Sequence, residues 1–121
     1  MNQRIPSGAK VVVIGGGVAG CSVAYHLAKY GWNDVVLLER DQLTSGTTWH
    51  AAGLIGQLGA SATLTKIRNH SLNLYKELEN ETELSSGLKQ NGSLTVATTQ
   101  GRLDELKRQV TTAQLFNVDA S

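Results

Sequence analysis

The sequence has few of the residues that mark several classes of protein. It contains one cysteine, one proline and 5% aromatic residues, and its formal net charge is only +1 over 121 residues. A single cysteine excludes a framework of disulfides within the chain and is typical of a reducing compartment. The near-neutral charge predicts no nucleic-acid partner, and the lack of a run of about 18 apolar residues predicts no membrane span. One cysteine and three scattered histidines predict no metal site. Glycine is abundant, with thirteen residues, which indicates tight backbone turns.

Two unbroken apolar runs lie near the start of the chain. Val11–Ile14 and Val35–Leu38 show no polar alternation, which is typical of strands buried on both faces of a parallel sheet. Residues 18–30 are rich in Ala, Val and Leu, and Gly31 follows where a left-handed C-cap is expected. Residues 10–40 are therefore predicted to form a right-handed βαβ unit.

The turn between the first strand and the helix has the pattern G-x-G-x-x-G in Gly15, Gly17 and Gly20. Gly15 allows the tight turn, Gly17 lets the backbone approach a pyrophosphate, and Gly20 permits close packing of helix on strand. The helix start also offers free N–H groups and a positive dipole end to phosphates. A lone glycine pattern is weak evidence, but its position between a predicted strand and a predicted helix indicates a dinucleotide site.

Glu39 ends the second apolar run, where a carboxylate can accept hydrogen bonds from the ribose hydroxyls of an adenosine. A 2′-phosphate would add a second negative charge beside this carboxylate, so FAD or NAD is predicted rather than NADP. The adjacent Arg40 softens that exclusion slightly.

Four further segments follow. Residues 41–61 are rich in Gly, Ser, Thr and Ala without a regular period, which predicts a functional loop. Residues 62–81 have apolar positions at helical spacing, and residues 92–98 alternate as a half-buried strand does. Residues 101–115 predict another one-sided helix.

These segments resemble a known group of flavoenzymes. Residues 11–40 resemble the FAD-binding start of the D-amino-acid-oxidase-like enzymes. Residues 43–54, with the sequence LTSGTTWHAAGL, resemble the flavin-attachment loop of the sarcosine dehydrogenase and dimethylglycine dehydrogenase family. Similarity continues over nearly the whole chain.

The resemblance implies an α/β fold in which residues 1–88 form the N-terminal part of a Rossmann-like FAD-binding domain with a parallel sheet. Residues 89–121 would begin a second, substrate-binding domain. Two strands are fewer than a doubly wound domain needs, so we expect an incomplete unit, inactive on its own.

The resemblance also implies which residues bind FAD. His50 corresponds to the histidine joined covalently to the 8α-methyl carbon of the flavin. Val18 and Ala19 would present N–H groups to the phosphates, and residues 45–54 would hold the flavin and pyrophosphate. The complete set of candidate binding residues is Gly15, Gly17, Val18, Ala19, Gly20, Glu39, Arg40, Ser45, Gly46, Thr47, Thr48, Trp49, His50, Ala51, Ala52, Gly53 and Leu54. No catalytic residue is assigned within this sequence.

The implied activity is FAD-dependent oxidative demethylation of an N-methylated glycine, sarcosine or dimethylglycine. The family uses tetrahydrofolate in a C-terminal domain, and an electron-transfer flavoprotein or oxygen as electron acceptor. An alternative is a non-catalytic relative similar to the regulatory subunit of pyruvate dehydrogenase phosphatase, but such relatives lose the Trp49-His50 pair. Another FAD-dependent amine or amino-acid oxidoreductase, or an NAD-linked dehydrogenase, is a further alternative. The absence of an Arg- and Ser-rich leader favours a bacterial cytoplasm over the mitochondrial matrix.

Overall fold

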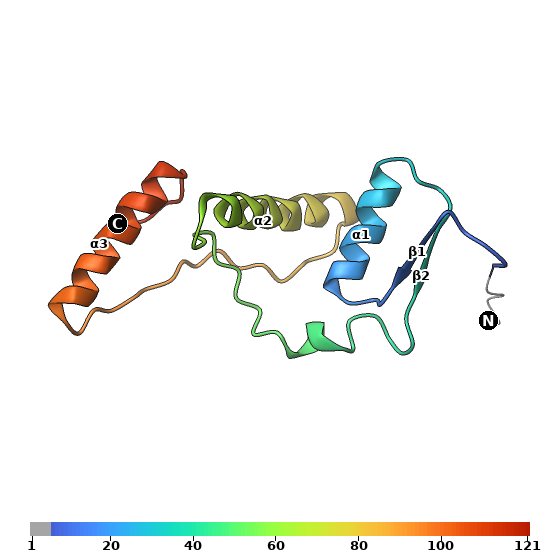
Figure 1. Ribbon diagram of the computed structural model, residues 1–121, viewed down its shortest axis with the longest axis horizontal. Helices are drawn as coiled ribbons and strands as arrows, with labels where there is room; N and C mark the ends of the chain where they lie inside the picture. Colours follow the sequence, from blue (N-terminus) through green and yellow to red (C-terminus); the bar gives the residue numbers. More distant parts are fainter. Residues whose placement is uncertain (1–5) are drawn as a thin grey trace. The chain divides into compact units, whose positions relative to one another are not determined.

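The computed structural model describes residues 6–121. Its elements are β1 (Val11–Ile14), α1 (Val18–Lys29), β2 (Val35–Leu38), the 3₁₀ turn η1 (Thr47–His50), α2 (Ala62–Thr82) and α3 (Gln100–Leu115) (Figure 1). The chain divides into two compact units, one ending at Leu54 and the other starting at Ile55, and each is described by itself. This division concerns packing within the chain, and the assignment of residues 1–88 and 89–121 to two domains stays a prediction.

The first unit is a parallel βαβ arrangement, as predicted. β1 and β2 pair in parallel, with Val11 opposite Val35 and Ile14 opposite Leu38. Because parallel neighbours need a crossover, α1 connects them and packs on the two-stranded sheet. Both strands have the bounds that their apolar runs predict.

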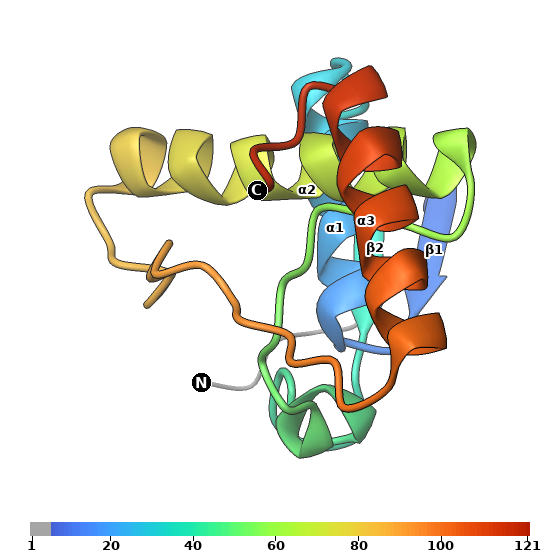
Figure 2. The same cartoon turned by 90° about the vertical axis from the view of Figure 1, so that its left-hand side faces the viewer.

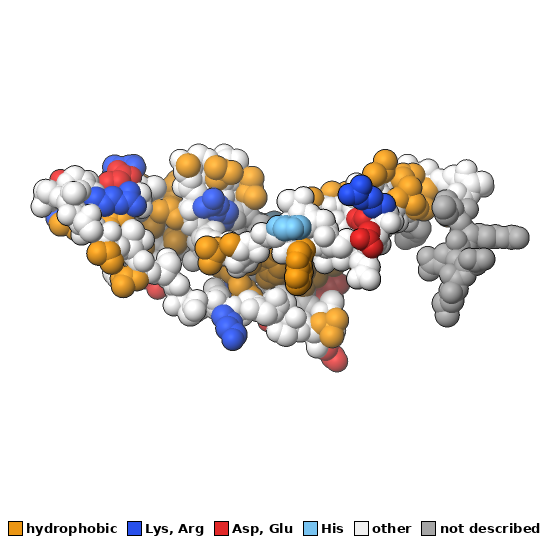
Figure 3. All heavy atoms as spheres, turned by 90° about the horizontal axis from the view of Figure 1, so that it is seen from below, with side chains coloured by type: hydrophobic (Ala, Val, Ile, Leu, Met, Phe, Trp, Pro, Cys, Tyr) orange, Lys and Arg blue, Asp and Glu red, His pale blue; other side chains and the backbone are white. Residues whose placement is uncertain are grey.

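α1 covers one face of this sheet, and the opposite face is open in the part of the unit that the structure describes. Side chains alternate along a strand, so Val12 and Ile14 point away from the face that Val13 shares with α1. Their side chains are 50% and 85% exposed, and Leu38, opposite Ile14, is 39% exposed. The expectation of strands buried on both faces is therefore wrong for these residues. Apolar side chains also lie open among polar groups on the face of the molecule drawn in Figure 3.

The C-terminus of α1 forms the glycine cap that the sequence predicts. Gly31 has φ +84°, in the left-handed region, and its N–H donates to the Ala28 carbonyl at 2.9 Å. The next N–H, that of Trp32, donates to Leu27 at 3.0 Å. This pair of bonds is a Schellman motif, which satisfies carbonyls left free at the helix end and turns the chain toward β2.

In the second unit, α2 begins at a serine cap and is anchored by a buried threonine. The Ser61 hydroxyl accepts the Leu64 N–H at 3.3 Å. Thr65 is fully buried, and its hydroxyl donates to the Ser61 carbonyl and accepts the Gly59 N–H, both at 3.0 Å. These bonds join the loop before α2 to its first turn. The helix extends one residue beyond the predicted 62–81.

The structure has no strand at residues 92–98, where the alternating pattern predicts one. Residues 83–99 connect α2 to α3 without regular structure (Figure 1). Leu94 and Val96 are 91% and 72% exposed. A strand needs a neighbour for its backbone N–H and C=O groups, and no described segment pairs with this one. The prediction of a strand here is therefore wrong for the described structure.

α3 spans one residue more than the predicted 101–115, and both of its ends are capped. The Thr99 hydroxyl accepts the Arg102 N–H at 3.3 Å. At the other end Asn117 has φ +55°, and the Val118 N–H donates to the Ala113 carbonyl at 2.9 Å. Ala113 and Val118 are both buried, as the apolar contact of a Schellman motif requires. Figure 2 shows α2 (green to yellow) and α3 (orange to red) as regular helices.

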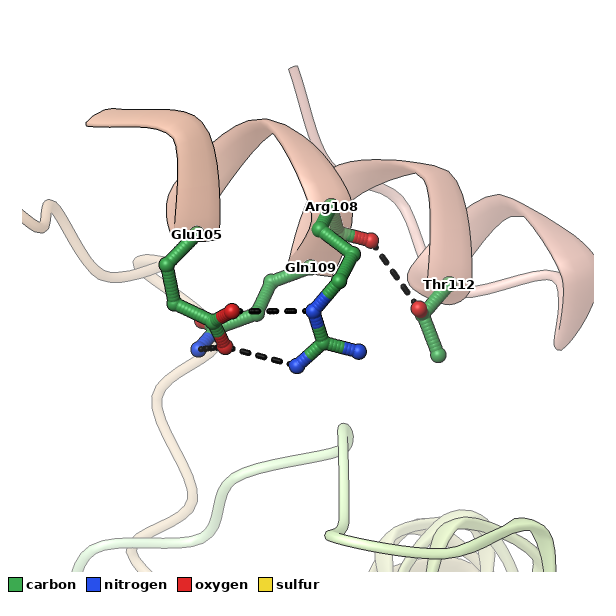
Figure 4. Close-up of polar contacts among 4 residues, drawn as sticks. All are labelled: Glu105, Arg108, Gln109 and Thr112. Atoms are coloured by element: carbon green, nitrogen blue, oxygen red, sulfur yellow. Dashed lines mark hydrogen bonds and ion pairs between the residues drawn. The ribbon is translucent and has the colours of Figure 1, made fainter. Parts of the chain in front are cut away.

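The exposed side of α3 carries an ion pair between Glu105 and Arg108, one turn apart at 2.7 Å (Figure 4). Hydrogen bonds from Arg108 and then Gln109 lower the pKa of Glu105 to about 2. Because water surrounds the pair, we assign it little stability. In the part of the chain that the structure describes, every helix is too short or too polar to cross a membrane.

We expect Thr65→Val to lower the free energy of unfolding by about 1–3 kcal/mol, because the part-buried Gly59 N–H loses its acceptor. The matched control is Thr111→Val, since the Thr111 hydroxyl donates to Lys107 on the exposed side of α3, where water can replace it. That control should change the free energy by no more than about 0.5 kcal/mol. Urea denaturation followed by circular dichroism measures both, and equal losses would contradict the anchoring role of Thr65.

Candidate functional site

The candidate site begins where β1 ends and the chain turns into α1. Gly15 has φ +103°, a conformation that residues with a Cβ rarely adopt. Its N–H donates to the Leu38 carbonyl at 2.8 Å, which continues the parallel ladder by one residue. The turn therefore starts from the carboxyl end of the sheet, where ligands bind in open α/β folds.

Gly16 is the residue around which the site is assembled, and it is buried. Its N–H donates to a carboxylate oxygen of Glu39 at 2.7 Å, and its carbonyl accepts the Thr44 N–H at 2.9 Å. A Cβ added here would lie 2.5 Å from Leu43 Cδ2 and 3.1 Å from Glu39 Cβ. The pattern G-x-G-x-x-G leaves the position of Gly16 blank and therefore predicts no role for it. The run of three glycines is the signal that could have identified it.

Gly17 and Gly20 bring the start of α1 close to the turn. A Cβ on Gly20 would collide with the Gly15 carbonyl, so this glycine packs as the fingerprint predicts. Gly17 is the N-cap of α1 and has no side chain to cap it. The Val18 N–H instead donates to Thr48 Oγ1 at 2.9 Å, from a segment thirty residues away. The turn before the helix, made of three glycines, thus has no Cβ atoms, which would let a pyrophosphate approach the backbone at the helix start.

The Glu39 carboxylate is held by three backbone N–H groups. One oxygen accepts from Gly16, and the other accepts from Arg40 at 2.8 Å and from Asp41 at 3.1 Å. These hydrogen bonds lower the pKa of Glu39, and the bond from Gly16 has the largest effect. The positive charge of Arg40 lowers this pKa further. The carboxylate is therefore ionised at neutral pH and has lone pairs for further donors such as ribose hydroxyls.

The loop after β2 is tied to the glycine turn through a strained residue. Thr44 has φ +69°, which is an outlier for a β-branched side chain. The Thr44 N–H donates to the Gly16 carbonyl, and the Thr44 carbonyl accepts the Trp49 N–H at 3.1 Å. Such strain persists only where surrounding contacts impose it, and it is frequent at functional sites. The sequence offered no signal for this role.

η1 carries the Trp49-His50 pair, in a loop where the sequence predicts no regular structure. Trp49 is 79% exposed, and it lines an open hollow of about 370 Å³ together with residues 42–45. His50 is exposed, and its Nδ1 lies 3.0 Å from the Gly46 carbonyl. A carbonyl oxygen only accepts, so Nδ1 carries the hydrogen of the neutral ring. The lone pair of the imidazole is then on Nε2.

The remaining candidate residues contribute less to the described network. The Ser45 hydroxyl donates to the Gln42 carbonyl at 2.8 Å, which shapes the loop itself. Gly53 has φ +70°, so the chain bends there. The other candidates lie on the exposed surface of the loop: Thr47, Ala51, Ala52 and Leu54. The structure thus joins the glycine turn, Glu39 and η1 into one hydrogen-bonded cluster. The residues after Ala51 lie outside this cluster.

The sequence is similar to known proteins over most of its length. Residues 10–120 match the family described as FAD dependent oxidoreductase. The chain is 49% identical over 120 residues to mitochondrial sarcosine dehydrogenase of Homo sapiens and 52% identical over 103 residues to mitochondrial dimethylglycine dehydrogenase of Homo sapiens. It is 46% identical over 104 residues to the mitochondrial regulatory subunit of pyruvate dehydrogenase phosphatase of Mus musculus.

These similarities cover most of this chain and a small part of each relative. They include 98%, 85% and 86% of the chain, respectively. The chain spans only 12–13% of the length of these relatives. The similarity therefore covers nearly all of this chain, including the glycine turn, Glu39 and the loop after β2, and only a small part of each relative.

We expect Gly16→Ala to weaken FAD binding by about ten- to a hundredfold, because relieving the contacts of the new Cβ must displace Leu43 or Glu39. Fluorescence titration of the flavin-free, full-length protein with FAD measures the dissociation constant. Gly8→Ala is the matched control, since a Cβ there meets nothing within 4 Å. An unchanged affinity in Gly16→Ala would rule out the central role of Gly16.

Proposed function

Because the chain belongs to the family of FAD-dependent oxidoreductases, we propose that the protein is an amine dehydrogenase or oxidase that demethylates a methylated glycine. Sarcosine and dimethylglycine are the proposed substrates, and the names of two relatives support this choice. The observation that carries the proposal is the hydrogen-bonded cluster of Gly16, Glu39 and η1. It joins the elements that a FAD site needs within one compact unit.

The residues divide into three groups by the part of FAD they would hold. The Ala19 N–H would face the phosphates, with the glycines leaving room for close approach. The Val18 N–H already donates to Thr48 Oγ1, so Val18 would line the phosphate site through its backbone without donating to it. Glu39 would accept the ribose hydroxyls, beside Arg40. The flavin would lie against the loop. The proposed binding set is Gly15, Gly17, Val18, Ala19, Gly20, Glu39, Arg40, and the loop residues Ser45, Gly46, Thr47, Thr48, Trp49, His50, Ala51, Ala52, Gly53 and Leu54.

His50 is the proposed point of covalent attachment, through Nε2. The Gly46 carbonyl holds the hydrogen on Nδ1, which leaves Nε2 as the nucleophile toward the 8α-methyl carbon. In the attachment one C–H bond breaks and one N–C bond forms, while the carbon and the imidazole each give up a proton. The two electrons released would go to oxygen or another two-electron acceptor. The exposure of His50 supports this role, since the ring is accessible to a cofactor.

The cofactor, when bound, would supply the redox chemistry, which is the removal of a hydride from the N-methyl carbon of the substrate to give an iminium ion. The described residues would orient FAD and hold its charge, and they include no proposed acid or base. The one-carbon unit would pass to tetrahydrofolate or leave as formaldehyde. An electron-transfer flavoprotein or oxygen would accept the electrons.

Two further features bear on the alternatives. A purely regulatory protein would not need a histidine placed for flavin attachment, so the retention of Trp49 and His50 favours an enzyme over a regulatory relative. The relatives compared above are all named mitochondrial, and this supports the mitochondrial matrix over the bacterial cytoplasm.

We expect anaerobic addition of sarcosine or dimethylglycine to bleach the flavin absorbance of the full-length protein, with one formaldehyde released per flavin reduced. Trimethylglycine is the matched control, because its quaternary nitrogen has no lone pair to stabilise an iminium ion. Stopped-flow spectroscopy follows the bleaching. Failure of both substrates, or formation of NADH without bound flavin, would exclude the proposed activity.

We expect the flavin of the wild-type protein to stay with the pellet after acid precipitation, and that of His50→Ala to remain in the supernatant. His70→Ala, a change at an exposed position on α2, should keep its flavin in the pellet. Nuclear magnetic resonance of the flavin peptide should locate the bond at Nε2. Finding all the wild-type flavin in the supernatant would falsify the covalent attachment.

A further inference from the structure

The N-terminus of α1 is capped by a side chain that is distant in sequence. The first N–H groups of a helix have no acceptor within the helix, and a Ser, Thr, Asp or Asn at the N-cap normally supplies one. Here the N-cap is Gly17, which has no side chain. Thr48 Oγ1 accepts the Val18 N–H at 2.9 Å and would lie 3.0 Å from a Cβ on Gly17. A glycine at the N-cap therefore leaves the space that this hydroxyl needs.

Thr48 belongs to the same short turn as His50. Within η1 and its caps, the Trp49 N–H donates to the Gly46 carbonyl, and the Ala51 N–H donates to the Thr48 carbonyl, both at 3.2 Å. His50 Nδ1 also bonds to the Gly46 carbonyl. Because these bonds make the turn internally rigid, fixing Thr48 on α1 also fixes the direction of the imidazole. The loop has a second attachment through Thr44, at its start.

We propose that Thr48 is a positioning residue for the attachment of flavin to His50. Its hydroxyl joins the helix start that receives the phosphates to the turn that carries the nucleophile. The two ends of the cofactor site are thereby held at a set separation before FAD binds. This inference rests on the proposed covalent attachment through His50 Nε2, with the bond changes and electron acceptor given above.

The reaction makes such positioning important. Nε2 must approach the 8α carbon closely and in line, and a loop that moves would spend little time in that geometry. Glycines and small residues surround η1, so the backbone of the loop has few side-chain contacts of its own to hold it. A hydrogen bond to a helix start is directional, and the positive end of the helix dipole strengthens it.

The test compares Thr48→Val, which keeps the shape but removes the acceptor, with Thr48→Ser, which keeps the hydroxyl. Flavin-free, full-length protein is mixed with saturating FAD and oxygen, and acid-precipitated samples give the rate of attachment. A His50→Ala background gives the FAD dissociation constant separately. We expect Thr48→Val to attach flavin about tenfold more slowly at saturation, and Thr48→Ser to stay within about twofold of wild type.

A second measurement reports on the hydrogen bond between the Val18 N–H and Thr48 itself. Hydrogen exchange of the Val18 amide in the flavin-free protein should be faster in Thr48→Val than in wild type or Thr48→Ser. If Thr48→Val does not fold, Thr48→Ala, which also lacks the acceptor, provides the comparison. A weaker FAD affinity with an unchanged rate at saturation would overturn the positioning role. If wild type attaches no flavin, the covalent proposal itself fails, whereas wild-type rates in the variants would refute only the inference about Thr48.

Discussion

The two hydrogen bonds of the Gly16 backbone hold the candidate site together. The N–H of this residue donates to Glu39, the acid that follows β2, and its carbonyl accepts the N–H of Thr44, near the start of the loop after β2. Because one peptide segment serves both, the turn, the acid and the loop cannot move independently. The absence of a Cβ is what allows this arrangement, since Leu43 and Glu39 fill the space where a side chain would lie. The strain at Thr44 is a local cost of the same arrangement.

The site therefore has two kinds of structural support. The parallel strands and α1 place the glycine turn, and their geometry is set by backbone pairing and by the close approach at Gly20. The loop that carries Trp49 and His50 has almost no buried side chains and depends on polar contacts. Such contacts are directional but individually weak in water. A bound cofactor would add contacts to this loop, which makes few contacts with the rest of the polypeptide.

Much of the first unit could be predicted from sequence because its signals are local. Apolar runs predict β1 and β2, Gly31 predicts the end of α1, and the glycine pattern predicts the close packing at Gly20. The contacts of Gly16, Thr44 and Thr48 could not be predicted in this way, since bonds between distant backbone groups leave no periodic pattern.

The second unit shows the opposite limit of sequence reasoning. The helical periods predict α2 and α3 to within a residue, because each helix satisfies most of its backbone groups internally. The alternation at residues 92–98 describes only one half of a strand pair. A strand also needs a neighbouring strand to pair with, and no local sequence pattern shows whether such a neighbour is present. The helices could therefore be predicted because their backbone hydrogen bonds are local, and the strand was wrongly predicted because its hydrogen bonds would have to be made to a distant segment.

The open face of the two-stranded sheet has a consequence for work on these residues. In a two-stranded sheet both strands are edges, so each has a row of backbone groups directed outward. Val12 and Ile14 add apolar surface beside these groups. Edges of this kind are templates on which a strand of another chain, including another copy, can pair. Protein concentration is therefore an experimental variable in its own right whenever this segment is studied apart from whatever covers it.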